Sequence, residues 1–177
     1  MNNKEYKQLE DDVIQLHLYY KVYEELFLSK SNIKVLNQSA PYFFFTFQNL
    51  LIGKLIIEIS KLTDPHIQGK NKNLSLGFLL ERTEDEDLKK ELRSLLSEIN
   101  EKVEHLRNHR SKFDAHRDLK IAIGQMELEP FSILQIKDIL NLIKNYMETF
   151  LGPTRAWTPI VGNNTQALVA TLQNGLF

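Results

Sequence analysis

Apolar residues recur at every third or fourth position through four long stretches of this chain, and no other feature limits its fold as strongly. The clearest stretch keeps one apolar stripe from Leu88 to Leu106, a spacing that gathers side chains on one face of an α-helix. The other three stretches cover about residues 4–28, 41–64 and 132–151. Amphipathic helices can bury their apolar faces against one another. The sequence therefore predicts an all-α fold, with a four-helix up-and-down bundle core and additional short helices.

Short local signals place several helix ends. Pro41 suits the first turn of the second long helix, and Pro65 disfavours helical backbone at the residue before it, so that helix should end near Asp64. We expect the third long helix to continue to about His116. Two pairs of residues have the spacing of a capping box at a helix start: Thr83 with Glu86, and Ser132 with Gln135.

The segments between the long helices are expected to be loops or short elements. Residues 29–40 and the polar run QGKNKN are predicted to be loops, and LSLGFLLE is a short apolar segment after the second of them. The run LKIAIGQMELEP breaks the helical pattern, as a loop or a short extended piece. Beyond a linker that contains Trp157, a C-terminal helix of about residues 163–175 is expected to pack on the bundle.

The chain has 177 residues and no cysteine. This length fits a single domain, residues 1–177, and no Gly/Ser linker or repeat divides it. The lack of cysteine excludes disulfides, thiolate nucleophiles and cysteine-ligated metal sites, and it is compatible with a reducing compartment. The first residues, MNNKEYKQLEDD, are polar and acidic, unlike a secretory signal. These features together predict a cytoplasmic protein.

Residues 42–59 are apolar enough to resemble a membrane span. Lys54, Glu58 and Lys61, however, recur at spacings of four and three, which places them on one stripe of a helix. Gln48 and Asn49 interrupt the earlier half. We therefore expect a central helix that is buried on most sides and exposes one narrow edge to solvent. We expect no membrane partner.

Charge is balanced over the whole chain but not along it. The net charge is −1, so the molecule lacks the global positive field that draws a protein nonspecifically onto nucleic acid. Residues 105–120 hold three of the five histidines together with Arg107, Arg110, Lys112, Arg117 and Lys120. Any nucleic-acid site must therefore be local, and this segment is where we expect it.

Within this segment, Arg110 is at odds with the helical pattern. The apolar stripe continued past Leu106 reaches positions 110, 113 and 117, and Arg110 falls within about 20° of the centre of the apolar face. Burying a guanidinium without a partner is expensive. Asp114 is one helical turn further on and can pair with it. If the stripe meets a second copy of the chain here, Arg110 and His116 from two chains would converge in one cleft.

An arginine and a histidine in one cleft could support phosphodiester cleavage. Arginine can bind a phosphate with two N–H groups, and histidine can accept or donate a proton near neutral pH. This reaction requires an RNA 2′-hydroxyl but neither a metal nor a cofactor. We expect no metal site, because His105 and His109 are one turn apart but only Glu101 or Glu104 could be proposed as a further ligand.

The stretch RSKFDAHRD, residues 110–118, resembles the R-x(4 to 6)-H signature of the HEPN superfamily, with five residues between Arg110 and His116. Within that superfamily the chain looks most like the AbiU-type abortive-infection proteins. The segments ISKLTDP, NLSLGFLL and AHRD support this, as does the C-terminal NNTQALVATLQ. The resemblance covers roughly residues 50–177.

The resemblance implies a bundle that forms a homodimer and brings two R-x-H motifs together. Many HEPN proteins are metal-independent endoribonucleases acting as toxins or phage-defence effectors, some of them opposed by a nucleotidyltransferase-type antitoxin. Arg110 and His116 would then be the catalytic pair. Asp114 and Ser111 are supporting residues, although Ser111 is shorter than the Asn or Asp common at its position. The candidates for binding RNA are His109, Lys112, Arg117 and Arg107.

The sequence leaves open two hypotheses in which the protein is not a catalyst. The first is a catalytically silent HEPN-like dimer that binds RNA, a nucleotide or a partner protein through the same groove. The second is a purely structural dimer in which Arg110 and Asp114 form a buried ion pair, since structural pairs are commoner than catalytic ones. The phenylalanines from Phe43 to Phe47 are expected to be core or interface, because no basic residues are interleaved with them to form a base-stacking platform.

Overall fold

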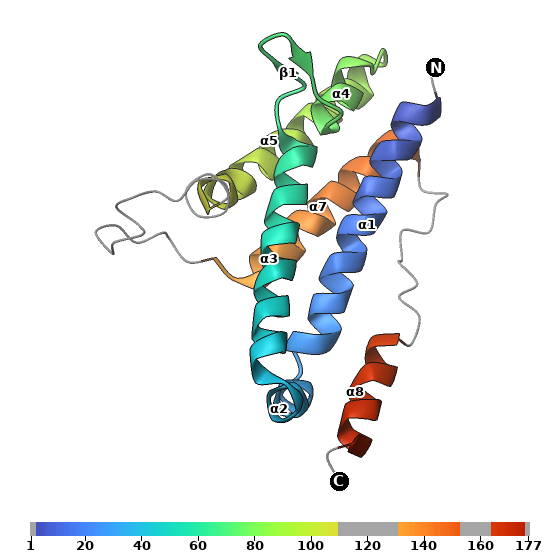
Figure 1. Cartoon of the computed structure of the whole chain (residues 1–177). Helices are drawn as coiled ribbons and strands as arrows, with labels where there is room; N and C mark the ends of the chain where they lie inside the picture. The colour runs from blue at the N-terminus through green and yellow to red at the C-terminus, as the bar shows by residue number, and fades with distance from the viewer. Residues whose placement is uncertain (1–2, 110–130, 153–163, 176–177) are drawn as a thin grey trace, which may run out of the picture.

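Four long helices form the body of the protein in the computed structural model, which describes residues 3–109, 131–152 and 164–175. Consecutive long helices run in opposite directions, so the bundle is up-and-down (Figure 1). The helix α1 packs on α3 and α7, and α5 packs on the same two helices, which closes a ring of four. The predicted all-α fold is confirmed. The four helices are α1 (Asn3–Phe27), α3 (Pro41–Thr63), α5 (Glu86–His109) and α7 (Ile133–Leu151).

The apolar stripes that predicted these helices form the core. In α5 the residues Leu92, Ile99, Val103 and Leu106 have no exposed surface. They meet buried residues of the other three helices in a single cluster, and burial on this scale is the main stabilising contribution to such a bundle. The members from the other long helices include Leu9, Val13, Leu16, Leu55, Ile59, Ile136, Ile143 and Tyr146.

Two shorter helices cover one end of the bundle. The helix α2 (Lys30–Ser39) occupies most of the segment that we expected to be a loop, so that prediction was wrong. Its short sequence shows little periodicity, and packing of Val35 and Leu36 against the second apolar cluster stabilises it. The helix α8 (Asn164–Gly175) packs on α2 and α1, with Val169 buried and the Thr165 hydroxyl donating to the Glu25 carboxylate.

A small hairpin and a short helix connect α3 to α5 at the opposite end (Figure 1). The run QGKNKN, expected to be a loop, contains part of a two-stranded antiparallel hairpin. Its turn has Gly69 at a positive φ of 63°, which is the position that a two-residue hairpin turn reserves for glycine. The apolar segment LSLGFLLE contains the short helix. The elements are β1 (Ile67–Gln68), β2 (Asn71–Lys72) and α4 (Leu76–Glu81).

One predicted helix cap is confirmed and the other is wrong. At the start of α7, Ser132 and Gln135 form the complete capping box. At the start of α5, the Oδ1 atom of Asp85 accepts hydrogen bonds from the backbone of Asp87 and Leu88. The Thr83 hydroxyl instead donates to the carbonyl of Leu79 in α4. The acidic run before α5 therefore does start the helix, but through an aspartate two residues after the threonine we expected.

The two halves of α3 have different surroundings. Its C-terminal half is a core element, as expected, and Lys54 and Lys61 both pair with Glu58 on its wet edge. Its N-terminal half is more exposed than we expected: Tyr42, Phe45 and Leu50 are 82%, 63% and 65% exposed. Among the described helices, α3 is long and apolar enough to cross a membrane by length and composition alone.

Candidate functional site

The predicted catalytic motif begins immediately after the last described residue of α5. Arg110, Ser111, Lys112, Asp114, His116 and Arg117 all lie outside the described residues, and so does the expected extension of the helix to His116. His109 is the last residue of α5, and its backbone alone is described. The structure therefore describes the helix that leads into the motif and the surroundings of that helix.

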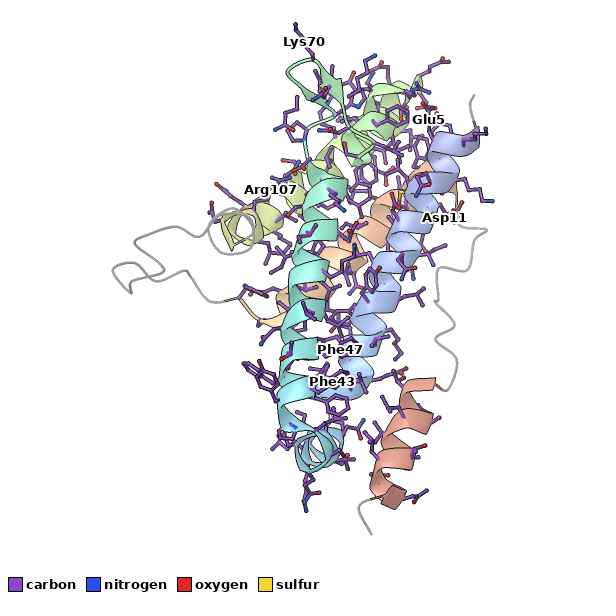
Figure 2. All side chains as sticks on the ribbon, in the orientation of Figure 1. Glu5, Asp11, Phe43, Phe47, Lys70 and Arg107 are labelled. Carbon is purple, nitrogen blue, oxygen red and sulfur yellow. The ribbon has the colours of Figure 1, made fainter. Side chains whose placement is uncertain are left out.

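Arg107 is the predicted site residue whose side chain the structure describes. It lies on the side of α5 that faces the end of α3 (Figure 2). Its Nη2 atom donates to the carbonyl oxygen of Thr63 at 2.5 Å and to Oδ1 of Asn100 at 2.8 Å. Pro65 stops α3 at this point, and the last carbonyls of a helix need donors from outside it. Arg107 supplies one, and its positive charge complements the negative end of the α3 dipole.

A pocket of about 450 Å³ opens beside Arg107. Its wall is built from three places in the sequence: the end of α3 with the residues that follow it, the short helix α4, and the last four turns of α5. The lining residues are Thr63, Asp64, Pro65, His66, Ile67, Gly77, Leu80, Glu81, Leu96, Asn100 and Arg107. The pocket thus combines acidic and basic side chains with apolar ones, and its residue Arg107 precedes the predicted motif by three residues.

Two other polar residues of this pocket, His66 and Asn100, are not among the site residues predicted from the sequence. The Nδ1 atom of His66 lies 3.1 Å from the carbonyl oxygen of Asn73, and its ring packs edge-on against Phe78 with centroids 5.3 Å apart. Asn100 is held by Arg107. His66 and Asn73 are seven residues apart in the chain, as are Asn100 and Arg107, but neither pair has the spacing of a helix cap or a tight turn that the sequence alone would reveal.

Comparison with known proteins identifies the family. The family model of AbiU2, of HEPN type, matches residues 3–157. The chain belongs to the HEPN AbiU2 family. No curated protein and no solved structure matches it. The match confirms the resemblance we drew from RSKFDAHRD, and it contains that whole segment. It also extends to α1, which we had left outside the resemblance, and it ends before α8, whose sequence we had counted in support.

The family match shows an abortive-infection, HEPN-like protein with a helical fold. In this HEPN bundle the pocket beside Arg107 lies at the end of α5 from which the motif follows in the sequence. The structure shows no group of three or more His, Asp or Glu side chains able to hold a metal ion among the described residues. His105 and His109, the pair considered above, have undescribed side chains.

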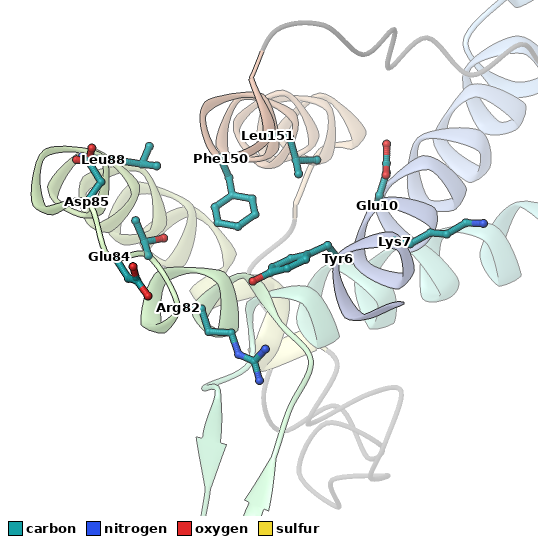
Figure 3. A pocket seen from close by; sticks show the side chains of 10 residues that line it. Tyr6, Lys7, Glu10, Arg82, Glu84, Asp85, Leu88, Phe150 and Leu151 are labelled. Carbon is teal, nitrogen blue, oxygen red and sulfur yellow. The ribbon is translucent and has the colours of Figure 1, made fainter. Parts of the chain in front are cut away.

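A second pocket, of about 380 Å³, lies at the opposite end of α5 in the HEPN bundle (Figure 3). Tyr6 and Phe150 form its apolar floor, with ring centroids 5.5 Å apart. Arg82 on its rim is already engaged, because it donates to Glu5 at 2.8 Å and stacks on Phe78 at 4.3 Å. Since α5 is 24 residues long, about 36 Å at 1.5 Å per residue, this pocket is remote from the motif.

Proposed function

We propose that this protein is a metal-independent endoribonuclease of a bacterial toxin or phage-defence type, acting in the cytoplasm, in which Arg110 and His116 carry out the chemistry. The observation that carries the proposal is the family match, which contains the complete R-x5-H segment. The described part of α5 supports it. Arg110 continues an apolar stripe in the sequence, and that stripe is buried as far as Leu106.

The reaction that these side chains support is attack of a ribose 2′-oxygen on the adjacent phosphorus. His116 can accept the proton of the 2′-hydroxyl or, when protonated, donate one to the leaving 5′-oxygen. The new P–O2′ bond forms as the P–O5′ bond breaks, which leaves a cyclic phosphate and a 5′-hydroxyl. Arg110 binds the phosphate and stabilises its developing negative charge. DNA, which lacks the 2′-hydroxyl, is not a substrate for this mechanism.

The other predicted site residues have supporting roles in this proposal. Asp114 orients the guanidinium of Arg110, assisted by Ser111. His109, Lys112 and Arg117 contact phosphates on either side of the cleaved bond, where their contribution is positional and insensitive to base sequence. Arg107 fixes the end of α5 through its bond to Thr63, so it holds the start of the motif at a defined place.

A homodimer is part of the proposal, because one motif alone supplies a single arginine and a single histidine. The exposed face of α3 supports association with a second copy. Tyr42, Phe45 and Leu50 expose most of their surface, and exposed apolar residues that cluster on one helix face are typical of interaction sites. Residues 41–53 carry no charge, and Gly53 follows on the same face, so two such helices could approach closely in a self-complementary interface.

The alternative function is a catalytically silent HEPN dimer that binds RNA, a nucleotide or a partner protein. The described pocket beside Arg107 favours a binding role independently of the motif. A nucleotidyltransferase-type antitoxin is a further proposed partner. A gene for such an enzyme beside the gene of this protein would favour the toxin hypothesis. The two functions differ in one respect that can be measured, which is whether RNA is cut.

The deciding experiment incubates purified protein with total RNA and with tRNA in EDTA and analyses the products on a denaturing gel. Wild type, His116→Ala and a control, Lys102→Ala on the exposed surface of α5, are compared. We expect cleavage by the wild type and the control and none by His116→Ala. Cleavage by His116→Ala contradicts the mechanism, and no cleavage by any of the three favours the binding function.

A further inference from the structure

We propose that the pocket beside Arg107 binds an RNA base, and that its polar groups select guanine. The role of this pocket in cleavage rests on the proposed function, whereas the binding itself does not. The described residues that line the pocket come from α3, α4, α5 and the segment between α3 and α4, and their side chains suit a nucleobase in size, polarity and charge.

The size and apolar walls suit a flat aromatic ring. The pocket holds about 450 Å³, within the range of small-molecule sites. Leu80 of α4 and Leu96 of α5 contribute apolar surface from two helices, and Ile67 contributes it from the hairpin. Gly77 lacks a side chain where a larger one would enter the space, and a Cβ atom there would lie 3.4 Å from Cβ of His66. Proteins recognise single-stranded RNA by enclosing unstacked bases in this way.

The charges in the pocket favour a base over a phosphate. Two carboxylates, those of Asp64 and Glu81, line it together with one guanidinium, that of Arg107. Both carboxylates would repel a phosphate, whereas the exposed carboxylate of Glu81 can accept from the N–H donors of a base. Phosphate binding is therefore assigned to the cationic segment that begins after Arg107, and base binding to the pocket.

Guanine is the base whose edges match both kinds of polar group. Its N1–H and N2–H₂ groups donate in parallel and suit a carboxylate, while O6 and N7 accept, most often from an arginine. Asn100 already accepts from Arg107 through its Oδ1 atom, so its NH₂ group is the part that can donate to a ligand. Adenine has no pair of adjacent donors for a carboxylate, and a pyrimidine leaves more of the pocket empty.

The pocket is held in place before any ligand binds. The backbone N–H of Asn73 donates to the carbonyl of His66 at 2.8 Å, and its side-chain amide donates to the carbonyl of Pro65 at 2.8 Å. Arg107 fixes the opposite wall through Thr63. A ligand therefore gains affinity without ordering these segments, which is the advantage of a preorganised site.

The position of the pocket relates the bound base to the cleaved bond. Arg107 precedes Arg110 by three residues, and three residues of chain span at most about 11 Å in any conformation. A base in the pocket and a phosphate bound by Arg110 are therefore close enough to belong to the same nucleotide or to neighbouring ones. The expected consequence is cleavage next to guanosine.

The binding test titrates the His116→Ala protein, which lacks the proposed catalytic histidine and keeps every described residue of the pocket, with GMP, AMP, CMP and UMP by calorimetry. We expect GMP to bind at least about tenfold more tightly than the others, since one good bidentate pairing discriminates by this much. Gly77→Leu, which fills the pocket, should abolish this binding. Leu88→Phe, in the pocket at the other end of α5, is the matched control and should bind GMP normally.

A second variant covers the case in which Gly77→Leu does not fold. Asp64→Ala combined with Glu81→Ala removes both carboxylates at the pocket rim, and it should bind GMP no better than AMP. The proposal is overturned if Gly77→Leu is folded and binds GMP as the wild type does, or if the double variant keeps the GMP preference. It is also overturned if the four nucleotides bind equally well or not at all.

Cleavage products separate this proposal from the proposed function. If wild type and Gly77→Leu cut RNA at the same places, the subsite is wrong while the nuclease stands. If GMP binds in the pocket but no RNA is cut, the subsite stands while the nuclease is wrong. If both are right, Gly77→Leu loses the preference for cleavage next to guanosine.

Discussion

Arg107 of α5 and Thr63 at the end of α3, 44 residues apart in the chain, are joined by a hydrogen bond of 2.5 Å from the guanidinium to the backbone carbonyl. This bond does two things at once. It satisfies a carbonyl at a helix end that Pro65 prevents from continuing, and it fixes the last turns of α5 against α3. The motif that follows α5 therefore starts from a fixed point.

Replacing Arg107 with lysine should lower the free energy of unfolding by about 1–3 kcal/mol, because a hydrogen bond from a charged donor is lost and a buried carbonyl is left without it. Lysine keeps the charge but cannot reach Thr63 and Asn100 with one planar group. Urea denaturation measures the change. Arg93→Lys, exposed on the same helix, should stay within about 0.5 kcal/mol of the wild type. Equal stability of both variants contradicts the role of the bond.

Arg110→Lys should reduce RNA cleavage on the order of 100-fold although the positive charge is kept. A lysine offers a point charge, whereas the proposed role of Arg110 is to bind two phosphate oxygens in a fixed plane, and losing one preorganised donor costs this much. Initial rates on a labelled RNA measure the effect. A variant as active as the wild type indicates that charge alone is needed. Lys102→Arg on α5 is the control and should leave the rate unchanged.

His17 should make the protein less stable in acid. Burial first, and then the charge of Lys144, lower the pKa of His17 below its usual value, although a bond to the backbone of Leu140 acts in the opposite direction. The unfolded chain therefore binds a proton more readily than the folded one. Above about pH 6.5 His17 is neutral in both the folded and the unfolded chain. Below that pH the unfolded chain takes up a proton first, so the free energy of unfolding decreases. Urea midpoints at pH 7 and pH 5 should differ less in His17→Leu than in the wild type.

The exposed face of α3 should control association. Phe45→Ser, alone or with Leu50→Ser, removes apolar surface that is 63% and 65% exposed in the single chain, so the monomer should fold normally. If a second copy covers this face, sedimentation velocity should show a shift from dimer to monomer. Leu134→Ser on α7, where the side chain is 59% exposed, is the matched comparison and should leave the association unchanged. A dimer that is unaffected by Phe45→Ser and Leu50→Ser must form through another surface.

Much of the fold could be predicted because it depends on periodicity. The stripe from Leu88 to Leu106 predicted the position of α5 and the face that it buries, and Ser132 with Gln135 predicted the start of α7. The helix α2 was missed because ten residues with two buried side chains give too short a pattern. The Thr83 cap was wrong because this hydroxyl has a second acceptor within reach, the carbonyl of Leu79.

The candidate site could be predicted only where it depends on local sequence. The motif segment was found from spacing, and it lies within residues 3–157, which the family model matches; its catalytic role stays a prediction. The pocket beside Arg107 could not be found in this way, because Asp64, Gly77 and Asn100 come from separate elements. Nothing near Asn100 in the sequence indicates that its partner Arg107 also reaches across to α3.

Tyr146 provides a test of the core that is independent of function. It is fully buried in α7, burial raises the pKa of its hydroxyl, and that hydroxyl donates to the carbonyl of Leu76 in α4 at 2.9 Å. Tyr146→Phe keeps the ring and should destabilise the protein by about 1 kcal/mol or more, because the buried carbonyl loses its donor. Tyr42→Phe, whose ring is 82% exposed, should have no effect. Urea denaturation measures the stability of both variants. If Tyr146→Phe were as stable as the wild type, this hydrogen bond would not contribute to stability, and apolar contacts would be what holds α4 to the bundle.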